Sequence, residues 1–273
     1  KLFGEIQNSF LICVICGEIT YTMEHVRKPE WLKIQIGANA RYADTKRIVD
    51  THKLHTICSS GRCPNLGECW GKGTATFMIG GAICTRSCKF CNTQSGKPLP
   101  LDPEEPRHVA ESIRLMKLDH AVITSVDRDD LPDLGAAHWA ETIRCIKEMN
   151  PDTTLETLIP DFQGRAELIR LVIHACPDII SHNLETVRRI TPLVRSVATY
   201  ERSLQVIRMI AESGITAKSG IMVGLGETPV GTAWICSAIS SPTWGKETCR
   251  AWEWSVWWLP PCWCSAVSAG WAR

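Results

Sequence analysis

Helix-like and strand-like segments alternate with short connections between residues 103 and 226 of this 273-residue chain. The first pair is an amphipathic stretch at 103–116, with acidic residues in its first turn, and an apolar, β-branched run at 120–126. Such alternation predicts a parallel sheet with helices packed on it, and four or more units suggest a full or partial β/α (TIM-like) barrel. In these barrels the functional groups lie at the carboxyl ends of the strands. Further helices are expected at 42–51, 135–149, 164–175 and 200–213, and further strands at 75–81, 153–160, 178–185 and 216–226.

The distribution of cysteine limits the class of protein. Six of the fourteen cysteines lie between Cys58 and Cys91. A secreted disulfide scaffold is usually short, rich in loops and dense in cysteine throughout, so this clustering favours metal binding in a reducing compartment. The formal net charge of +1 provides no overall field that would attract nucleic acid or an anionic membrane. We therefore expect a cytoplasmic protein with neither kind of partner.

Cys84, Cys88 and Cys91 have the spacing C-x3-C-x2-C directly after an expected strand. Structural zinc takes four protein ligands, usually as two spaced pairs, and three crowded thiolates do not supply that set. They do suit a cubane of four irons in which three corners are held by cysteine and the fourth iron stays open. Phe90 is placed to shield such a cluster and to tune its potential.

A second triplet precedes the first. Cys58, Cys63 and Cys69 have the spacing C-x4-C-x5-C in a segment, 58–73, that is expected to be an irregular loop. Taken alone, this triplet is also compatible with zinc binding or with disulfides. Its position just before the first triplet favours a second iron–sulfur cluster.

The C-x3-C-x2-C spacing, with an aromatic residue before the last cysteine, resembles the radical S-adenosylmethionine superfamily. Together with the second triplet, a set of ordered motifs makes residues 24–228 resemble the lipoyl synthase family. These motifs are KPEWLK (28–33), CPNLGECW (63–70), CTRSCKFCNT (84–93), TSVDRDDLPD (124–133), ETLIPDF (156–162), HNLETV (182–187) and MVGLGE (222–227).

The resemblance implies an enzyme, a sulfurtransferase that inserts two sulfur atoms at C6 and C8 of a protein-bound octanoyl chain. It implies S-adenosyl-L-methionine and two 4Fe-4S clusters as cofactors. The cluster at Cys84, Cys88 and Cys91 would generate the radicals, and the cluster at Cys58, Cys63 and Cys69 would be consumed as the sulfur donor. The implied partners are an octanoylated lipoyl-carrier domain or glycine-cleavage H protein, and an electron donor such as flavodoxin or ferredoxin.

Polar residues at strand ends are candidates for binding S-adenosylmethionine or the substrate, because barrel strands present these positions to the site. Arg195 joins them because its segment resembles a family segment near the cofactor. The alternative for each is a structural role, such as satisfying loop amides. We expect His182 to be structural and Cys145 and Cys176 to be small buried residues. The candidate set is Thr124, Ser125, Asp127, Glu156, Asn183, Glu185 and Arg195.

The two ends of the chain differ from its middle. Residues 1–22, which precede Met23, are interpreted as a non-native leader, and 23–73 as an N-terminal extension that carries the second-cluster loop. Residues 74–228 are the expected partial barrel. Residues 229–273 hold eight of the eleven tryptophans and show neither helical nor strand period, so we interpret them as an aberrant, frameshift-like tail; a binding or lipid-interface surface is the alternative.

Lipoyl synthases close with an Arg-Ser-Ser-Tyr motif whose serine is the fourth ligand of the second cluster, and this motif does not occur in the sequence. We therefore expect a barrel without its last strand and helix, and a chain that is inactive in sulfur insertion. Two alternatives remain. One is another radical enzyme with an auxiliary cluster, such as a biotin-synthase-like enzyme or a methylthiotransferase, although the order of the triplets argues against it. The other is a non-catalytic iron–sulfur or zinc protein.

Overall fold

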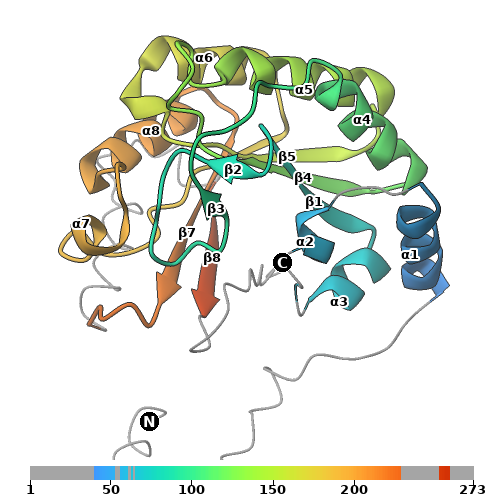
Figure 1. Ribbon diagram of the computed structural model, residues 1–273, viewed down its shortest axis with the longest axis horizontal. Helices are drawn as coiled ribbons and strands as arrows, with labels where there is room; N and C mark the ends of the chain where they lie inside the picture. Colours follow the sequence, from blue (N-terminus) through green and yellow to red (C-terminus); the bar gives the residue numbers. More distant parts are fainter. Residues whose placement is uncertain (1–39, 53–55, 61–62, 64, 229–251, 259–273) are drawn as a thin grey trace, which may run out of the picture. The chain divides into compact units, whose positions relative to one another are not determined.

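The computed structural model describes residues 40–52, 56–60, 63, 65–228 and 252–258, and its centre is a six-stranded parallel sheet (Figure 1). The strands follow the order β1-β4-β5-β6-β7-β8, so each new strand is added at the same side of the sheet. Helices α4, α5, α6 and α8 form a layer on one face of this sheet. The predicted partial β/α barrel is confirmed.

Apart from β8, the elements of the barrel agree with the predicted segments to within a few residues. The strands are β1 (Thr74–Ile79), β4 (His120–Ser125), β5 (Thr154–Leu158), β6 (Ile179–Ser181), β7 (Thr216–Val223) and β8 (Trp252–Trp258). The covering helices are α4 (Glu105–Leu115), α5 (Ala136–Met149), α6 (Ala166–His174) and α8 (Tyr200–Glu212). Strand β6 is shorter than expected because it ends at Ser181, although Glu185 still pairs with Ile221 of β7.

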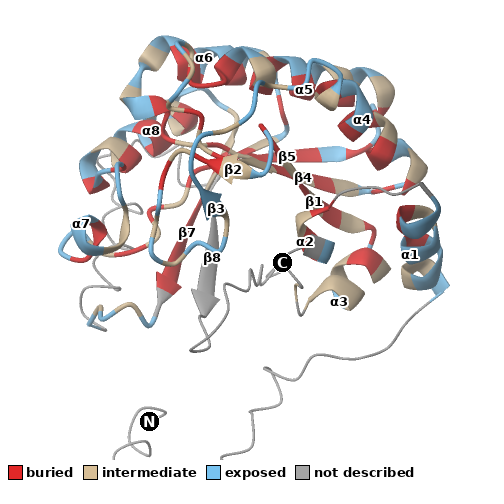
Figure 2. Ribbon diagram, in the orientation of Figure 1, coloured by how far each residue is buried: buried red, intermediate tan, exposed pale blue. Residues whose placement is uncertain are grey.

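The main core lies between the sheet and the helices. Alternate residues of β1 and β4 face this layer, and the buried residues of the helices line the face towards the sheet (Figure 2). Ala121 and Ile123 of β4 and Ile143 of α5 are fully buried there. The opposite strand positions, such as His120 and Thr124, face the interior of the partial barrel.

Short elements lie at the start of the barrel. Helix α1 (Ala40–His52) confirms the predicted helix, and α2 (Ile57–Ser60) and α3 (Leu66–Gly71) pack against β1. The expected irregular loop at 58–73 was therefore wrong in part, because it contains these two helical turns. Two further short elements, α7 (Thr191–Val194) and the 3-10 turn η2 (Phe162–Gly164), lie in the connections after β6 and β5.

The expectation of a tail without regular structure is wrong for residues 252–258. These residues form β8, which runs parallel to β7 with Ala217 opposite Trp252 and Val223 opposite Trp258. The reason is visible in the sequence: in WEWSVWW, apolar residues occupy every second position, which is a strand period. The sheet therefore has a strand beyond β7. The predicted leader at 1–22, the extension up to residue 39 and the rest of the 229–273 tail lie outside the described residues, so these assignments stay predictions.

Within the described part of the chain, no helix combines the length and the apolar character needed to cross a bilayer.

Candidate functional site

The loop that carries Cys84, Cys88 and Cys91 is closed by a small two-stranded parallel sheet. Strand β2 (Ile83–Cys84) precedes the loop, β3 (Gln94–Ser95) follows it, and Gly96 N–H donates to the carbonyl of Cys84 at 2.9 Å. Within the loop, Cys91 N–H donates to the carbonyl of Cys88 at 3.0 Å. The three thiols therefore lie in one short closed loop. Cys84 is buried, Cys88 is half-buried and Cys91 is exposed.

Main-chain N–H groups point at the buried sulfur of this loop. Cys84 Sγ accepts from the N–H groups of Arg86, at 3.4 Å, and Asp127, at 3.3 Å. Burial raises the pKa of the Cys84 thiol, and these two donors oppose that rise. N–H···S contacts of this kind stabilise a sulfur that carries negative charge, as a metal-bound thiolate does.

The same loop is joined to the segment after α7. Lys89 N–H donates to the carbonyl of Val194 at 2.8 Å, and Ser87 N–H donates to Ser196 Oγ at 3.1 Å. Arg195 lies between these two contacts, so the cysteine loop and Arg195 are held side by side. The sequence predicted Arg195 as a candidate but did not predict this connection.

Four of the predicted polar residues gather at this loop. Asp127 follows β4. Burial raises the pKa of both Asp127 and Glu185, and the nearby charge of Arg195 opposes the rise in each. Glu185 is also hydrogen-bonded to Asn183, and Arg195 Nη1 donates to the carbonyl of Asn183 at 3.4 Å. Asp127, Asn183, Glu185 and Arg195 thus form one connected polar group, the polar cluster, beside Cys84.

One atom of the polar cluster has no partner. Arg195 Nε is buried, and no hydrogen-bond acceptor for it is found among the described residues. Arg195 Nη1 is already engaged with Ser203 Oγ at 3.0 Å, so the guanidinium is held in place. Buried donors in native proteins nearly always have an acceptor, so this orphan N–H indicates a position where a ligand atom would bind.

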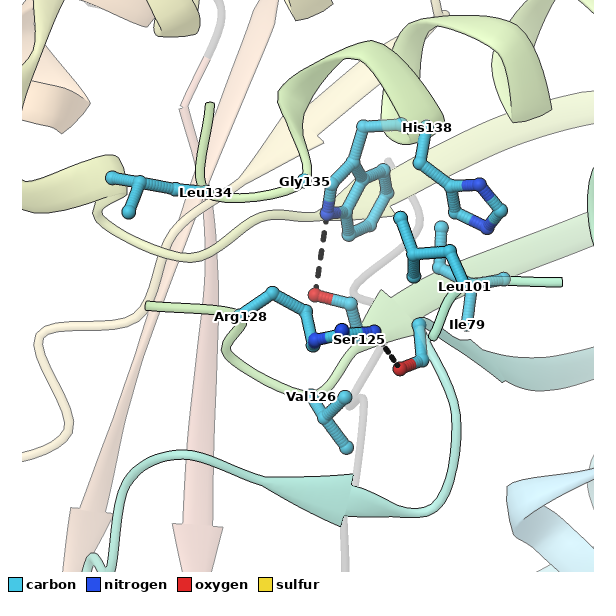
Figure 3. A pocket seen from close by; sticks show the side chains of 10 residues that line it. Ile79, Leu101, Ser125, Val126, Arg128, Leu134, Gly135 and His138 are labelled. Atoms are coloured by element: carbon cyan, nitrogen blue, oxygen red, sulfur yellow. Dashed lines mark hydrogen bonds between the residues drawn. The ribbon is translucent and has the colours of Figure 1, made fainter. Parts of the chain in front are cut away.

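Thr124 and Ser125 separate, because neighbouring residues of a strand face opposite sides. Ser125 shares its side with Ala121 and Ile123, and its hydroxyl accepts a hydrogen bond from Trp139 Nε1 of α5 at 3.2 Å. Figure 3 shows Ser125 lining a small hollow on the helix side of the sheet, together with Ile79 and His138. This position favours a structural role for Ser125. Thr124 faces the barrel interior.

Glu156 lies in the barrel interior, but protein partners already satisfy its carboxylate. Its Oε1 accepts from Ser181 Oγ at 2.8 Å, and its Oε2 lies 3.0 Å from Lys218 Nζ and 3.3 Å from His120 Nε2. Burial alone would raise the pKa of Glu156, yet the contacts with His120 and Lys218 lower it to about 2. His120 is the first residue of β4, at the end of the strand remote from Cys84. These contacts favour a structural role for Glu156.

The structure can be compared with the structural roles expected for His182, Cys145 and Cys176. His182 is buried, with Nδ1 at 2.9 Å from the carbonyl of Ile159 and Nε2 at 3.0 Å from Ser203 Oγ, which bears out a structural role. Cys176 is exposed and Cys145 is only half-buried, so the expectation that both are buried was wrong. Cys176 lies just after α6 with a φ of 56°, where the chain turns at the surface.

Cys58, Cys63 and Cys69 form the second group of thiols. Cys63 N–H donates to the carbonyl of Cys58 at 3.0 Å, and burial together with the nearby charges of Cys58 and Cys63 raises the pKa of Cys69 to about 11. Cys58 Sγ accepts the N–H of Thr76, at 3.4 Å, on the free edge of β1. The second triplet is therefore attached to the strand that leads to the first.

The donor chemistry of each triplet fits an iron–sulfur cluster, because each supplies three thiols. In the part of the chain that the structure describes, no three Cys, His, Asp or Glu side chains converge on one point as the ligands of one metal ion would. A cubane binds each thiolate at its own iron corner, so its ligands stay apart. Each triplet supplies three thiols, and Cys84 and Cys58 both receive main-chain N–H donors.

Sequence reasoning missed residues that surround the cysteine loop. Arg86, Asp129 and Asp161 form a buried ion network there, and none of them was predicted. The sequence contains two signals that could have indicated these residues. Arg86 stands inside the cysteine motif, and both aspartates follow strands at their carboxyl ends, which are the positions where barrel residues reach a site.

Comparisons with known proteins agree with this site. Residues 78–231 match the Radical SAM superfamily family model. Methylornithine synthase (PylB) has the same fold, with a TM-score of 0.50 at 13% identity over 81% of this chain and 64% of that chain. HydG, a maturase of the [FeFe]-hydrogenase, has a TM-score of 0.50 at 16% identity over 72% of this chain and 50% of that chain. Fold and cysteine loop together define a radical S-adenosylmethionine enzyme.

Curated relatives identify the family within the radical S-adenosylmethionine superfamily. Lipoyl synthase of Phocaeicola vulgatus is 80% identical over 207 residues, which are 76% of this chain and 73% of the relative. Lipoyl synthase of Bacteroides fragilis is 81% identical over 206 residues, which are 76% of this chain and 72% of the relative. Lipoyl synthase of Treponema denticola is 57% identical over 202 residues, which are 74% of this chain and 70% of the relative. The chain belongs to the lipoyl synthase family, whose members catalyse sulfur insertion. Membership in the superfamily implies S-adenosylmethionine and a 4Fe-4S cluster.

Proposed function

We propose that this chain has the architecture of a two-cluster lipoyl synthase, built to insert sulfur at C6 and C8 of an octanoyl chain on a carrier protein. The observation that carries the proposal is that β1 connects the two thiol triplets. Cys58 contacts this strand at Thr76, and the chain continues from its last residue, Ile79, through four residues to Cys84. The two triplets therefore flank one strand of the sheet.

The proposed roles divide between the triplets. When bound, S-adenosylmethionine and the cluster at Cys84, Cys88 and Cys91 supply a radical that removes hydrogen, and the cluster at the other triplet supplies sulfur. A carbon radical must meet sulfur before it is quenched, so the chain must hold the donor and the octanoyl chain at short range. Attachment of Cys58 to β1 supports this role, because it ties the second triplet to the rigid sheet.

The polar cluster is proposed to bind S-adenosylmethionine. Its carboxylates, Asp127 and Glu185, complement the ammonium and sulfonium groups of this ligand, and Arg195 Nε is a free buried donor for a carboxylate. Asn183 orients Glu185 and Arg195 through its side chain and its carbonyl. Thr124 completes the set from the barrel interior. The other two predicted residues, Ser125 and Glu156, are left out because protein partners occupy them.

Metal analysis is the first test of the proposal. After anaerobic reconstitution we expect about eight irons, with matching sulfide, per chain, as two four-iron clusters require. About four irons would contradict the second cluster, and zinc without sulfide would contradict the assignment of both triplets.

Paired variants test the division of roles. Cys88→Ala is expected to abolish the reductive cleavage of S-adenosylmethionine, whereas Cys63→Ala is expected to keep this cleavage and to lose the iron and sulfide of the second triplet. Mass spectrometry of 5′-deoxyadenosine and of the octanoylated carrier peptide measures cleavage and product, and iron and sulfide analysis measures the second cluster. Equal behaviour of the two variants would refute the division, and cleavage with a non-sulfur product would favour another radical enzyme with an auxiliary cluster.

Whether this chain completes the reaction is a separate matter. The serine of the Arg-Ser-Ser-Tyr motif has no counterpart in the sequence, so no residue is assigned as fourth ligand of the second cluster. We expect cleavage of S-adenosylmethionine without lipoyl product. Formation of lipoyl product from an octanoylated lipoyl-carrier domain or H protein, with flavodoxin or ferredoxin as electron donor, would show this expectation to be wrong. A cytoplasmic location is proposed because the thiols of both triplets need reducing conditions.

A further inference from the structure

Arg86 is the most heavily paired residue next to the cysteine loop. It stands between Cys84 and Cys88, and its side chain is 3% exposed. Its Nε and Nη2 donate to the two oxygens of Asp129 at 2.6 and 2.8 Å, in a forked pair. Its Nη1 lies 3.2 Å from Asp127 Oδ1, and its Nη2 lies 2.8 Å from Asp161 Oδ1. One guanidinium thus binds three carboxylates that follow β4 and β5.

Stability alone is a poor explanation for this arrangement. The Arg86 guanidinium is held in a buried place by three carboxylates that surround it. Removing charged groups from water costs several kcal/mol each, and well-packed apolar residues often replace such networks without loss of stability. A network of this kind is better suited to fixing positions than to adding stability.

The contacts of Cys84 show which position the ion network fixes. Its sulfur accepts the N–H of Arg86 itself and the N–H of Asp127, so both donors belong to residues of the ion network. Thr85 adds to the same junction, since its hydroxyl donates to the carbonyl of Asp127 at 2.9 Å and accepts from Asp129 N–H at 3.1 Å. The Arg86 side chain ties Asp127 and Asp129 to the cysteine loop, so loss of its ion pairs would loosen the junction that directs both main-chain donors at the sulfur.

We propose that Arg86 is a positioning residue for the radical site, because its three-carboxylate clamp holds Cys84 against two main-chain N–H donors. The proposal rests on the proposed function, in which Cys84 binds the cluster that cleaves S-adenosylmethionine. N–H···S contacts stabilise the more negative, reduced form of such a cluster. The clamp therefore sets both the place of the Cys84 sulfur and how readily the cluster accepts an electron.

Arginine is required for this clamp because of its shape. Its planar fork offers five donors, whereas lysine offers one compact charge that cannot bind three carboxylates in these directions. Arg86→Lys keeps the charge and removes the fork. Arg202→Lys is the matched control, because Arg202 Nη1 pairs with the other oxygen of Asp161, at 3.1 Å, and forms no hydrogen bond or ion pair with the cysteine loop among the described residues.

The first measurement needs no cluster. Hydrogen exchange of the metal-free full-length chain reports how firmly residues 84–89 are held. Arg86→Lys is expected to speed exchange in this segment by about tenfold or more, while Arg202→Lys leaves it unchanged. Asp129→Asn, which keeps Arg86 and weakens its forked pair, is expected to act in the same direction. This variant also carries the test if Arg86→Lys does not fold.

The second measurement uses the reconstituted chain. Arg86→Lys is expected to lower the reduction potential of the cluster that responds to S-adenosylmethionine in electron paramagnetic resonance. It is also expected to slow the formation of 5′-deoxyadenosine by about tenfold or more, within the range seen for residues that orient metal ligands. If the parent chain forms no cluster that responds to S-adenosylmethionine, the proposed function fails. If the parent does so and Arg86→Lys matches Arg202→Lys in exchange, potential and cleavage, the role of Arg86 is overturned.

Discussion

Replacing Glu156 with glutamine is expected to destabilise the barrel by about 3 kcal/mol at neutral pH. Glu156 is 6% exposed, and its carboxylate lies within 3.3 Å of Ser181, Lys218 and His120. These contacts hold the pKa of Glu156 at about 2, against an ordinary value of 4.5. At about 1.4 kcal/mol per pH unit, that difference corresponds to about 3 kcal/mol of unfolding free energy.

A second argument gives the same order of magnitude. The side chain of Lys218 is 14% exposed, so Glu156→Gln leaves an ammonium group buried without its counter-charge. Breaking a buried ion pair by removing one partner costs about 3–5 kcal/mol. Both routes therefore predict an effect well above that of an ordinary surface change, which is within about 0.5 kcal/mol.

Urea unfolding of the metal-free chain, followed by circular dichroism, measures this effect. Glu148→Gln is the matched control, because Glu148 is exposed on α5. The pH dependence adds a second signature. Between pH 4.5 and 2 the unfolded chain binds a proton at Glu156 that the folded chain does not, so stability falls as the pH falls through this window. Glu156→Gln should lack this part of the acid dependence. A loss below about 1 kcal/mol, or an unchanged acid profile, would refute the reasoning.

Three further changes test the sheet and the site. Thr76→Pro removes the N–H that donates to Cys58 Sγ at the edge of the sheet. Because an edge strand tolerates proline, we expect normal folding with less iron retained at the second triplet. Equal iron in variant and parent would contradict this expectation. Arg195→Ala removes the orphan donor and should weaken S-adenosylmethionine binding by about tenfold or more, measured by equilibrium dialysis, while unchanged binding would exclude Arg195 from the ligand site. Ile143→Ala empties a fully buried position of α5 and should cost about 2–5 kcal/mol in urea unfolding, whereas a cost below about 1 kcal/mol would mean that the core collapses around the gap.

The barrel was predictable because its signals are local. Strand residues such as Ala121 and Ile123 alternate with polar or inward positions, and the helices between strands carry one apolar face each. The missed strand β8 had the same period, but the abundance of tryptophan around it hid the alternation. The short helices α2 and α3 were missed for another reason: segments of four and six residues carry too few turns to show a helical period.

The site was only partly predictable, since it depends on contacts between distant segments. Strand-end positions indicated Asp127 and Glu185, which lie in the polar cluster, but the same rule also selected Ser125 and Glu156. Ser125 turned to the helix layer through strand alternation, which the sequence does show. For Glu156 the deciding partners, His120 and Lys218, lie 36 and 62 residues away. No local pattern reveals that a carboxylate is already paired at such separations.

The order of the two triplets along the chain follows from the role of β1. This strand is the first of the sheet and has one free edge, which would otherwise present unpaired N–H groups to other chains. Cys58 Sγ caps one of these groups at Thr76, and α2 and α3 pack beside the strand, so the segment before β1 protects its edge. The segment after β1 leads directly to Cys84. A second triplet placed after the barrel would have to return to this edge across the whole sheet. Placing it before β1 attaches the second triplet to the strand that leads to Cys84 with the shortest connection, so the contact that protects the edge also joins both thiol groups to one strand.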